Sequence, residues 1–360
     1  MGKKRKLNQS GTTATEEIDT TKPTAVFVPK GGRSSTLSVA IPGSCIANAV
    51  SHDQKNHLAG IVARALAVFC VDEVIIFDDE DTSHKSHKSH RQEGDHGYTG
   101  YSDPGHFLSH LFAYLETPPY LRKALFPMHP DLKTAGSLPS LDMPHHSKSF
   151  PGCPYREGVT IRYDSKPPDI GTRVDIGLNK WALIPDVEIP PKTRVTVQTL
   201  SNTSSSTQQV SSDQTFDFSA CTAVSPDTPR TTSGYYWGYN IRRSTSLSTV
   251  FTECPFPSGY DLSIGTSERG VPLSTLISSP TSPILPYQHL LLVFGGPSGL
   301  EYAAKNDPDL RSKGITGSNI NELFDYWVNV LPGQGSRTIR TEEAVWLGLM
   351  GVREIVVKNE

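Results

Sequence analysis

The sequence predicts an α/β domain that is interrupted by a small β-barrel. Strands alternate with amphipathic helices up to about Pro144 and again from about Tyr235, and this alternation is typical of a parallel sheet. From about Pro151 the pattern changes to short alternating strands between proline turns, which favours a small barrel such as an OB-fold. We expect a basic tail at residues 1–34, the two halves of the α/β domain at 35–147 and 233–360, and the OB-like barrel at 148–232.

The first half begins with a βαβ unit. Thr36–Ser44 alternates like a strand and ends in a Pro-Gly turn. Ser51 then begins a helix, with Gln54 as its capping-box partner. The apolar positions of that helix follow at helical spacing: Leu58, Ile61, Val62, Ala65, Leu66 and Phe69. The next strand, Glu73–Asp79, is apolar enough to be buried on both faces of a parallel sheet.

Residues 80–102 form a loop rich in His, Ser and Lys, and a second helix follows it. Asp103 and Pro104 supply its N-cap and first-turn proline. Its apolar stripe consists of Leu108, Leu111, Phe112 and Leu115. Pro118 and Pro119 interrupt this helix before Tyr120–Phe126 continues as helix.

The barrel strands are expected at Gly158–Asp164, Thr172–Ile184 and Thr193–Leu200, followed by a loop at Ser201–Thr215. The second half of the α/β domain then begins. Its elements are a strand at Tyr235–Arg242, a short helix at Ser246–Phe251, a strand and loop at Tyr260–Gly270, a strand and glycine loop at Leu290–Glu301, and a glycine loop that leads into a helix within Asn329–Gly351.

The composition excludes several classes of protein. The 360 residues carry a formal charge of −3, and their five scattered cysteines form no CxxC pair, which favours reduced thiols in an intracellular compartment. No apolar segment follows the N-terminal charges, so no secretion signal is predicted, and no run approaches the roughly 18 apolar residues of a membrane span. Lys3–Lys6 is read as a nuclear import signal, a phosphate-contacting arm or a solubilising tail.

Common nucleotide and metal motifs are absent. Gly333 and Gly335 form a GxG, but Thr338 replaces the third glycine of a dinucleotide site, and the loop follows the last strand rather than the first. Gly265 and Gly270 are spaced as in a P-loop, yet Val271 and Pro272 follow them instead of Lys and Ser/Thr. The histidines of the Lys/Ser-rich loop lack rigid support, so no metal is expected there: His84, His87, His90 and His96.

Three glycine-containing loops remain, at residues 265–270, 295–299 and 332–341. Each follows an apolar strand, and ligands of open α/β sheets bind at the carboxyl ends of strands. Glycine allows a backbone to approach a ligand closely. Arg269, Arg337 and Arg340 add positive charge, so the loops predict a small-molecule pocket beside an anionic partner.

Seven segments occur in an order that resembles a known family: Ile41–Ser44, Leu58–Asp79, Tyr120–Leu132, Tyr235–Arg242, Tyr260–Gly270, Leu290–Gly296 and Pro332–Ala344. The family is the eukaryotic and archaeal branch of SPOUT-class RNA methyltransferases, in which an OB-like barrel interrupts the catalytic domain. The resemblance implies an α/β fold with a C-terminal trefoil knot and S-adenosylmethionine as cofactor. It also implies a homodimer, or a heterodimer with a paralogous SPOUT protein, in which the partner contributes to the active site.

The resemblance also implies roles for individual residues. Thr266 and Arg269 would reach the cofactor or the target nucleotide, and Gly295 and Gly296 would form the second cofactor loop. The methionine and adenine pocket would be lined by Asn329, Val330, Leu331, Pro332, Gly335, Ser336 and Ile339. Arg64 matches a position at which SPOUT proteins often carry a substrate-facing arginine, and its alternative is a structural ion pair near Asp72 or Glu73.

The function implied is methylation of RNA, with large-subunit rRNA in the nucleolus as the expected substrate and uridine N3 as the expected atom. Loss of the N3 proton leaves negative charge on the ring, which Arg269 or Arg340 would stabilise. Glu342 and Glu343 fit stabilisation of the helix N-terminus and are not expected to act as a base. The alternative is a catalytically weak or inactive assembly factor that binds rRNA as a dimer in pre-60S particles.

Overall fold

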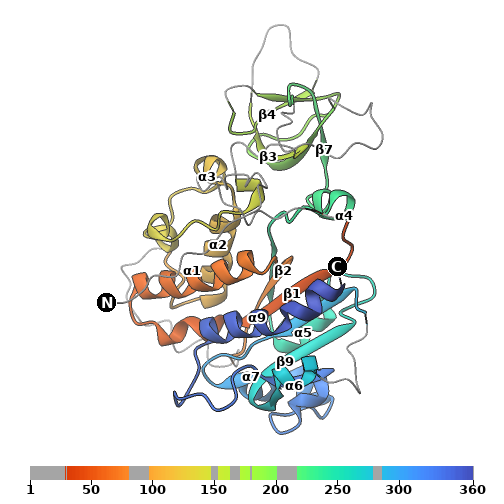
Figure 1. Ribbon diagram of the computed structural model, residues 1–360. Coiled ribbons are helices and arrows are strands. Elements are labelled where there is room, and N and C mark those ends of the chain that lie inside the picture. The colour runs from red at the N-terminus through yellow and green to blue at the C-terminus, as the bar shows by residue number, and fades with distance from the viewer. Residues whose placement is uncertain are drawn as a thin grey trace, which may run out of the picture.

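The computed structural model describes residues 29, 31–80, 97–146, 153–162, 171–178, 181–200, 217–278 and 286–359. A parallel six-stranded sheet with helices on both faces forms the larger body, and an antiparallel five-stranded sheet lies at one end of it (Figure 1). The predicted α/β class is confirmed. The Lys3–Lys6 cluster, the histidine-rich loop and the Ser201–Thr215 loop lie outside the described residues.

The parallel sheet combines strands from both halves of the chain. Its order is β11 (Tyr326–Asn329), β9 (Leu262–Pro272), β10 (His289–Val293), β1 (Thr36–Pro42), β2 (Glu73–Phe77) and β8 (Asn240–Ser244). All five neighbouring pairs are parallel. The carboxyl ends of the six strands therefore lie at one edge of the sheet, where open α/β folds bind their ligands.

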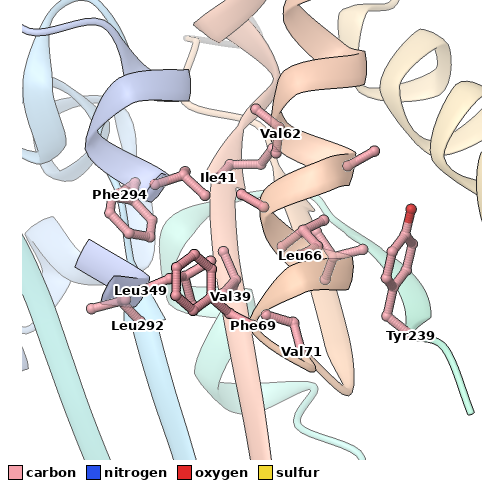
Figure 2. Close-up of a cluster of buried hydrophobic side chains, with 14 of the residues drawn as sticks. Val39, Ile41, Val62, Leu66, Phe69, Val71, Tyr239, Leu292, Phe294 and Leu349 are labelled. Carbon is pink, nitrogen blue, oxygen red and sulfur yellow. The ribbon is translucent and has the colours of Figure 1, made fainter. Parts of the chain in front are cut away.

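Helices cover both faces of this sheet. One face packs against α1 (His52–Val68), α2 (Pro104–Glu116) and α9 (Thr341–Asn359). The other face packs against α5 (Leu247–Thr252), α7 (Gly299–Asn306) and α8 (Pro308–Ser312). In Figure 2, Val62 and Leu66 of α1 and Leu349 of α9 surround Val39 and Leu292 of the sheet. Burial on both faces explains why the central strands are almost continuously apolar.

Several shorter helices complete the fold. The α-helices are α3 (Pro119–Leu125), α4 (Thr228–Ser233) and α6 (Leu273–Ser278), and the 3₁₀ helices are η1 (Gly43–Asn48), η3 (Pro130–Leu132), η4 (Ala135–Ser137), η5 (Pro144–His146) and η6 (Ile320–Leu323). None of the helices in the described part of the chain is both long and apolar enough to cross a bilayer.

The predicted helix starts are confirmed by their capping contacts. The Ser51 hydroxyl accepts a hydrogen bond of 3.2 Å from the Gln54 amide, and the Gln54 side chain accepts one of 3.3 Å from the Ser51 amide. The Asp103 carboxylate accepts a hydrogen bond from the His106 amide at the start of α2. Such caps satisfy backbone donors that the first helical turn leaves unpaired.

Two expected strands differ from the structure. Tyr235–Arg242 is irregular until Asn240, because the buried Tyr236 and Tyr239 point their hydroxyls at the carbonyls of Val71 and Phe112 rather than alternating across a sheet. Thr172–Ile184 forms two strands, β4 (Gly171–Asp175) and β5 (Ala182–Pro185), that pair with each other as a hairpin.

The antiparallel sheet occupies the chain between η5 and α4. The strands that complete it are β3 (Tyr155–Thr160), β6 (Arg194–Thr199) and β7 (Cys221–Val224), and the order is β5-β4-β3-β6-β7. A parallel bridge between Leu183 of β5 and Ala220 beside β7 brings the two edges together. The apolar interior consists of Val174, Ile176, Ala182, Ile184, Val197, Phe218 and Cys221.

Arg194 of β6 connects this sheet to the α/β body. Its guanidinium donates to the Glu116 carboxylate of α2 at 3.0 Å and to the Glu157 carboxylate of β3 at 2.6 Å. Burial alone would raise the pKa of Glu116, but Arg194 and His145 together hold it well below its usual range. The Trp237 ring nitrogen donates to Glu157 at 2.7 Å, so both carboxylates are paired.

Candidate functional site

Three chain segments meet at the carboxyl ends of β11, β9 and β10, which are neighbours in the sheet. They are residues 266–270 within β9, residues 294–299 after β10, and residues 330–340 between β11 and α9. The first segment was expected as a loop, but β9 continues through it to Pro272. Gly265 of β9 pairs with Trp327 of β11, and the next residue of β11, Val328, pairs with Val271. Residues 266–270 of β9 therefore form a bulge.

Side-chain hydrogen bonds join these segments to one another. The buried Thr266 hydroxyl donates to the Val293 carbonyl at the end of β10 at 3.0 Å. The Asn329 amide donates to the Glu268 carbonyl in the β9 bulge at 2.9 Å. The Asn329 side chain also accepts from the Leu331 amide at 2.9 Å, which shapes the start of the last segment. Thr266 and Asn329, both predicted site residues, thus hold the backbone of the site.

The last segment returns from the sheet edge to the middle of the sheet. At its end the Thr341 hydroxyl donates to the Gly295 carbonyl at 3.0 Å. Glu342 and Glu343 follow in the first turn of α9, and the Glu343 carboxylate accepts from the Arg340 amide at 3.0 Å. The expected helix-start role of the two glutamates is therefore confirmed.

The glycines of the site fall into two kinds. A Cβ on Gly295 would lie 2.8 Å from the Leu300 nitrogen, and one on Gly270 would lie 2.6 Å from the Val328 Cα, so these two positions require glycine for backbone packing. At Gly333 and Gly335, by contrast, no atom of the described structure lies within 4 Å of an added Cβ. These two glycines border open space.

A cleft of about 850 Å³ lies between α1 and α9, beside the last segment. Leu331, Ile339 and Arg340 from the last segment line one side of it, and Gln54 and Ile61 of α1 line the other. Of the residues predicted to line a cofactor pocket, Asn329, Val330 and Ile339 are half-buried, whereas Leu331, Pro332, Gly335 and Ser336 are exposed. Apolar side chains make up most of the cleft lining, as in most small-molecule sites.

Two exposed arginines flank the site, each beside a glutamate. The Arg269 guanidinium lies 3.6 Å from the Glu301 carboxylate, which also accepts from the Ser267 hydroxyl at 3.0 Å. The Arg340 guanidinium lies 3.7 Å from the Glu342 carboxylate. Both guanidinium groups are largely exposed, and exposed ion pairs of this length are weak. These arginines are therefore available to anions in solution.

Arg64 does not join this assembly. Its guanidinium donates to the carbonyls of Ser140 and Leu141 at 3.1 and 2.7 Å. The ion-pair alternative is wrong as well, because Asp72 pairs with Arg33 and Glu73 with Arg242. Helical spacing explains the difference. Arg64 lies one turn after Gly60, and an added Cβ on Gly60 would contact Leu138, so this face of α1 packs against the 138–141 segment.

Sequence reasoning missed Ser44 and Asp79. The Ser44 hydroxyl donates to the Asp79 carboxylate at 2.5 Å, and a Cβ on Gly296 would lie 3.1 Å from the same carboxylate. Burial raises the pKa of Asp79 to about 6, although the Ser44 hydrogen bond lowers it. The other oxygen, Oδ1, has no hydrogen-bond partner among the described residues. The sequence could have indicated Asp79, because this residue comes directly after a buried strand whose carboxyl end lies at the ligand-binding edge of the sheet.

The arrangement suits a ligand bound mainly by backbone groups. Hydrogen bonds fix the backbones of the three segments against one another, and Leu331 and Ile339 supply apolar contacts in the cleft. No cysteine is among the described residues that line the cleft, and His57 supplies its one imidazole. This lining and the two arginines fit an organic cofactor beside an anionic substrate.

Comparison with known proteins supports one family. The family described as "Putative RNA methyltransferase" matches residues 36–352. The chain is 43% identical over 323 residues to a human protein named "28S rRNA (uridine-N(3))-methyltransferase", covering 89% of this chain and 79% of the human one. A Drosophila melanogaster protein of the same name is 40% identical over 326 residues, covering 89% of this chain and 62% of its own length.

Among solved structures, the chain resembles a SpoU methyltransferase, AviRb from Streptomyces viridochromogenes, solved in complex with AdoMet. The identity is 10%, the TM-score is 0.32, and the match covers 91% of this chain and 60% of AviRb. That similarity is too low to define the fold.

Proposed function

The chain belongs to the RNA methyltransferase family that matches residues 36–352, and from this premise we propose that it methylates N3 of a uridine in large-subunit rRNA, with S-adenosylmethionine as methyl donor. Two relatives, at 43% and 40% identity, bear the name of that activity. The observation that carries the proposal is the hydrogen-bonded group of three segments at the carboxyl edge of the sheet, opening into the cleft beside α9.

The cofactor would be held mainly by backbone groups. By the family resemblance, Gly295 and Gly296 would form one wall and the segment from Asn329 to Ile339 the other. Leu331 and Ile339, which line the cleft, would lie against the apolar parts of the ligand. When bound, S-adenosylmethionine supplies a methyl group activated by the adjacent sulfonium. Thr266 and Thr341 would act indirectly, because their hydroxyls bind the carbonyls of Val293 and Gly295 and so position the segments that contact the ligand.

The two exposed arginines would act on the RNA. Uridine N3 carries a proton that must leave before or during methylation, and the ring then holds negative charge. A guanidinium beside the ring stabilises such charge, and one beside the backbone binds phosphate. Arg269 and Arg340 are the candidates because each lies on a site segment with its head group exposed. Arg64 is not included, since two carbonyls already accept its hydrogen bonds.

The inserted sheet would hold the surrounding RNA as an OB-like barrel at residues 148–232. The proposal is supported by the strand pairing: β3, β4 and β5 form a meander, β6 pairs with β3, β7 pairs with β6, and a parallel bridge connects β5 to the start of β7. OB-folds are five-stranded Greek-key barrels that bind oligonucleotides. The Arg173 guanidinium lies 5.4 Å from the exposed Trp181 ring, and both side-chain types bind single-stranded RNA.

The C-terminal region would form the trefoil knot of SPOUT proteins. The chain leaves β11 at the sheet edge and reaches Gly295, just after β10 and two strands away, where α9 begins. On this path it passes the bulge of β9, and Gly270 of that bulge approaches the Val328 backbone so closely that no Cβ fits. This return path across β9 supports the proposed knot.

A second copy of the chain would cover the face formed by α1 and α9. Val50, Leu347 and Met350 are exposed apolar residues on this face, with 81%, 36% and 65% of their surfaces accessible. Val50 and Leu347 also line the cleft beside Arg340, so a partner there would complete the site. Light scattering is expected to report a dimer for the wild type and a monomer for Met350→Glu with Leu347→Glu. A partner of a different sequence would instead appear as a wild-type monomer.

The proposed setting is the nucleolus, during assembly of pre-60S particles. The experiment that tests the function is mass spectrometry of rRNA from cells that lack the protein. We expect one N3-methylated uridine of the large-subunit rRNA to be lost, and to be restored by the wild type but not by Gly335→Trp, which places a bulky side chain in the last segment of the proposed site. Restoration by both would favour an assembly factor without catalysis, and an unchanged rRNA would refute the proposal.

A further inference from the structure

A second group of chemically competent side chains lies away from the three segments, between α2 and η3. His106 and His110 are four residues apart on α2 and therefore share one helix face. Asp131 of η3 faces them, and its carboxylate is completely buried, whereas the two histidine side chains are 42% and 17% exposed. The ligating atoms of these three residues all lie within 4.8 Å of one another.

The distances match the spacing of ligands around an ion better than they match hydrogen bonds. The Nδ1 atoms of His106 and His110 each lie 3.5 Å from Asp131 Oδ2. Nitrogen-to-oxygen hydrogen bonds are typically about 2.9 Å long and are weak at 3.5 Å. Zinc ligands at about 2.1 Å in a tetrahedron are separated by roughly 3.4 Å. Both nitrogen-to-oxygen distances are therefore close to the separation of two ligands of a tetrahedral zinc ion.

The carboxylate is fixed by hydrogen bonds from Thr99. The Thr99 amide donates to Asp131 Oδ1 at 2.9 Å, and the Thr99 hydroxyl donates to Oδ2 at 2.7 Å. Hydrogen bonds of this kind orient ligating carboxylates in metal sites. The Thr99 hydroxyl also lies 3.1 Å from His106 Nδ1, and that histidine would have to release this contact in order to bind zinc through Nδ1. The opening on the side of His106 gives an ion a way in.

We propose that His106, His110 and Asp131 bind one zinc ion, through the Nδ1 atoms of the histidines and Oδ2 of the aspartate. Imidazole and carboxylate ligands in a four-coordinate arrangement suit zinc among the common divalent ions. His129 lies beside the fourth position, with its Nδ1 3.4 Å from Oδ2. That nitrogen accepts a hydrogen bond of 3.2 Å from the Asp131 amide, which it would have to release in order to ligate.

The site would be structural. It connects α2, η3 and the turn at Gly97–Thr99, which are separated in the chain but packed together here. Binding to the folded state alone stabilises that state by mass action. In the sequence, the spacing of His106 and His110 by four residues indicates two imidazoles on one helix face.

The test is zinc binding by the full chain after removal of metal with a chelator. Because the histidine-rich loop carries further imidazoles, the matched control is His84→Ala with His87→Ala and His90→Ala. We expect calorimetry to detect one tight zinc site per chain in the wild type and in this control, and at least a tenfold weaker site in His106→Ala with His110→Ala. Equal affinity in the wild type and the His106/His110 variant would overturn the proposal, and so would loss of all binding in the control.

Two further measurements do not depend on the double variant folding. In the control protein, zinc is expected to raise the midpoint of thermal unfolding, and an unchanged midpoint would contradict a structural ion. Cobalt in the same protein is expected to give the intense visible absorption of a tetrahedral site and to lose it in the single variant His106→Gln, whose side chain is the most exposed of the three. Weak bands of the octahedral type, unaffected by His106→Gln, would contradict the assignment.

Discussion

The hydroxyl of Thr341, the first residue of α9, donates a 3.0 Å hydrogen bond to the carbonyl oxygen of Gly295, at the end of β10. The two residues are 46 positions apart in the chain: Thr341 directly follows the segment of residues 330–340, and Gly295 belongs to the segment of residues 294–299. The contact therefore fixes the last segment against the second glycine loop. The position of α9 and the shape of the proposed cofactor site depend on each other.

Replacing Thr341 with valine should weaken cofactor binding. The change preserves the shape of the side chain but leaves the Gly295 carbonyl without its donor, which costs about 1 kcal/mol for a typical hydrogen bond. We expect the dissociation constant for S-adenosylmethionine, measured by calorimetry, to rise about fivefold. Thr316→Val, in an exposed loop away from the site, is the control. Equal affinities for both variants would show that the contact does not shape the site.

Two glycines of the site should respond to alanine in opposite ways. At Gly270 the new Cβ would overlap the backbone of Val328, so we expect strong destabilisation or failure to fold. At Gly335 no atom lies within 4 Å, so the thermal midpoint of Gly335→Ala should remain within about 2 °C of the wild type. Differential scanning calorimetry compares them. A stable Gly270→Ala protein would contradict the close approach of the two backbone segments.

Arg194→Ala should loosen the inserted sheet from the α/β body. It leaves the buried carboxylates of Glu116 and Glu157 without their shared cation, and breaking a buried ion pair costs about 3–5 kcal/mol. Arg243→Ala removes an exposed pair with Asp103 and should cost less than about 1 kcal/mol. Limited proteolysis is expected to cut Arg194→Ala between the two bodies much faster than Arg243→Ala. Similar cleavage rates would indicate that other contacts hold the insertion.

Asp79→Asn should stabilise the protein in a way that depends on pH. Burial raises the pKa of Asp79 to about 6 in the folded chain, above its ordinary value of 3.8. The folded state therefore holds the proton more tightly, and stability falls as the pH rises from about 4 to about 6. A shift of two pKa units corresponds to about 3 kcal/mol, which is the upper limit for the gain from asparagine above pH 6.

Urea unfolding of the wild type and Asp79→Asn at pH 4.5 and pH 7.5 measures this difference. The advantage of the asparagine variant is expected to be larger at the higher pH. Equal differences at both pH values would mean that the Asp79 carboxyl keeps an ordinary pKa in the folded protein.

The helix starts and the central strands could be predicted from the sequence because their signals are local. The Ser51 and Gln54 pair and the Asp103 cap act within four residues, and the strands around Val74 and Leu291 are apolar because the sheet is covered on both sides. Such local patterns do not depend on the rest of the chain.

The predictions that differ from the structure concern residues whose positions depend on tertiary contacts. Tyr236 and Tyr239 lie in an aromatic run that is typical of a strand, yet their hydroxyls bind carbonyls of distant helices and loops. Arg64 was assigned by family resemblance, but the segment at residues 138–141 covers its face of α1. Asp79 and His106 were missed because their partners, Ser44 and Asp131, are 35 and 25 positions away in the chain.

The most direct test of the central claim is methyl transfer by the purified protein. The chain is incubated with S-adenosylmethionine carrying a labelled methyl group and with large-subunit rRNA that lacks the modification, and the RNA is then digested to nucleosides. We predict label in N3-methyluridine for the wild type and at least a hundredfold less for Gly335→Trp. Label in another nucleoside, or equal labelling by both proteins, would contradict the proposed reaction and its site.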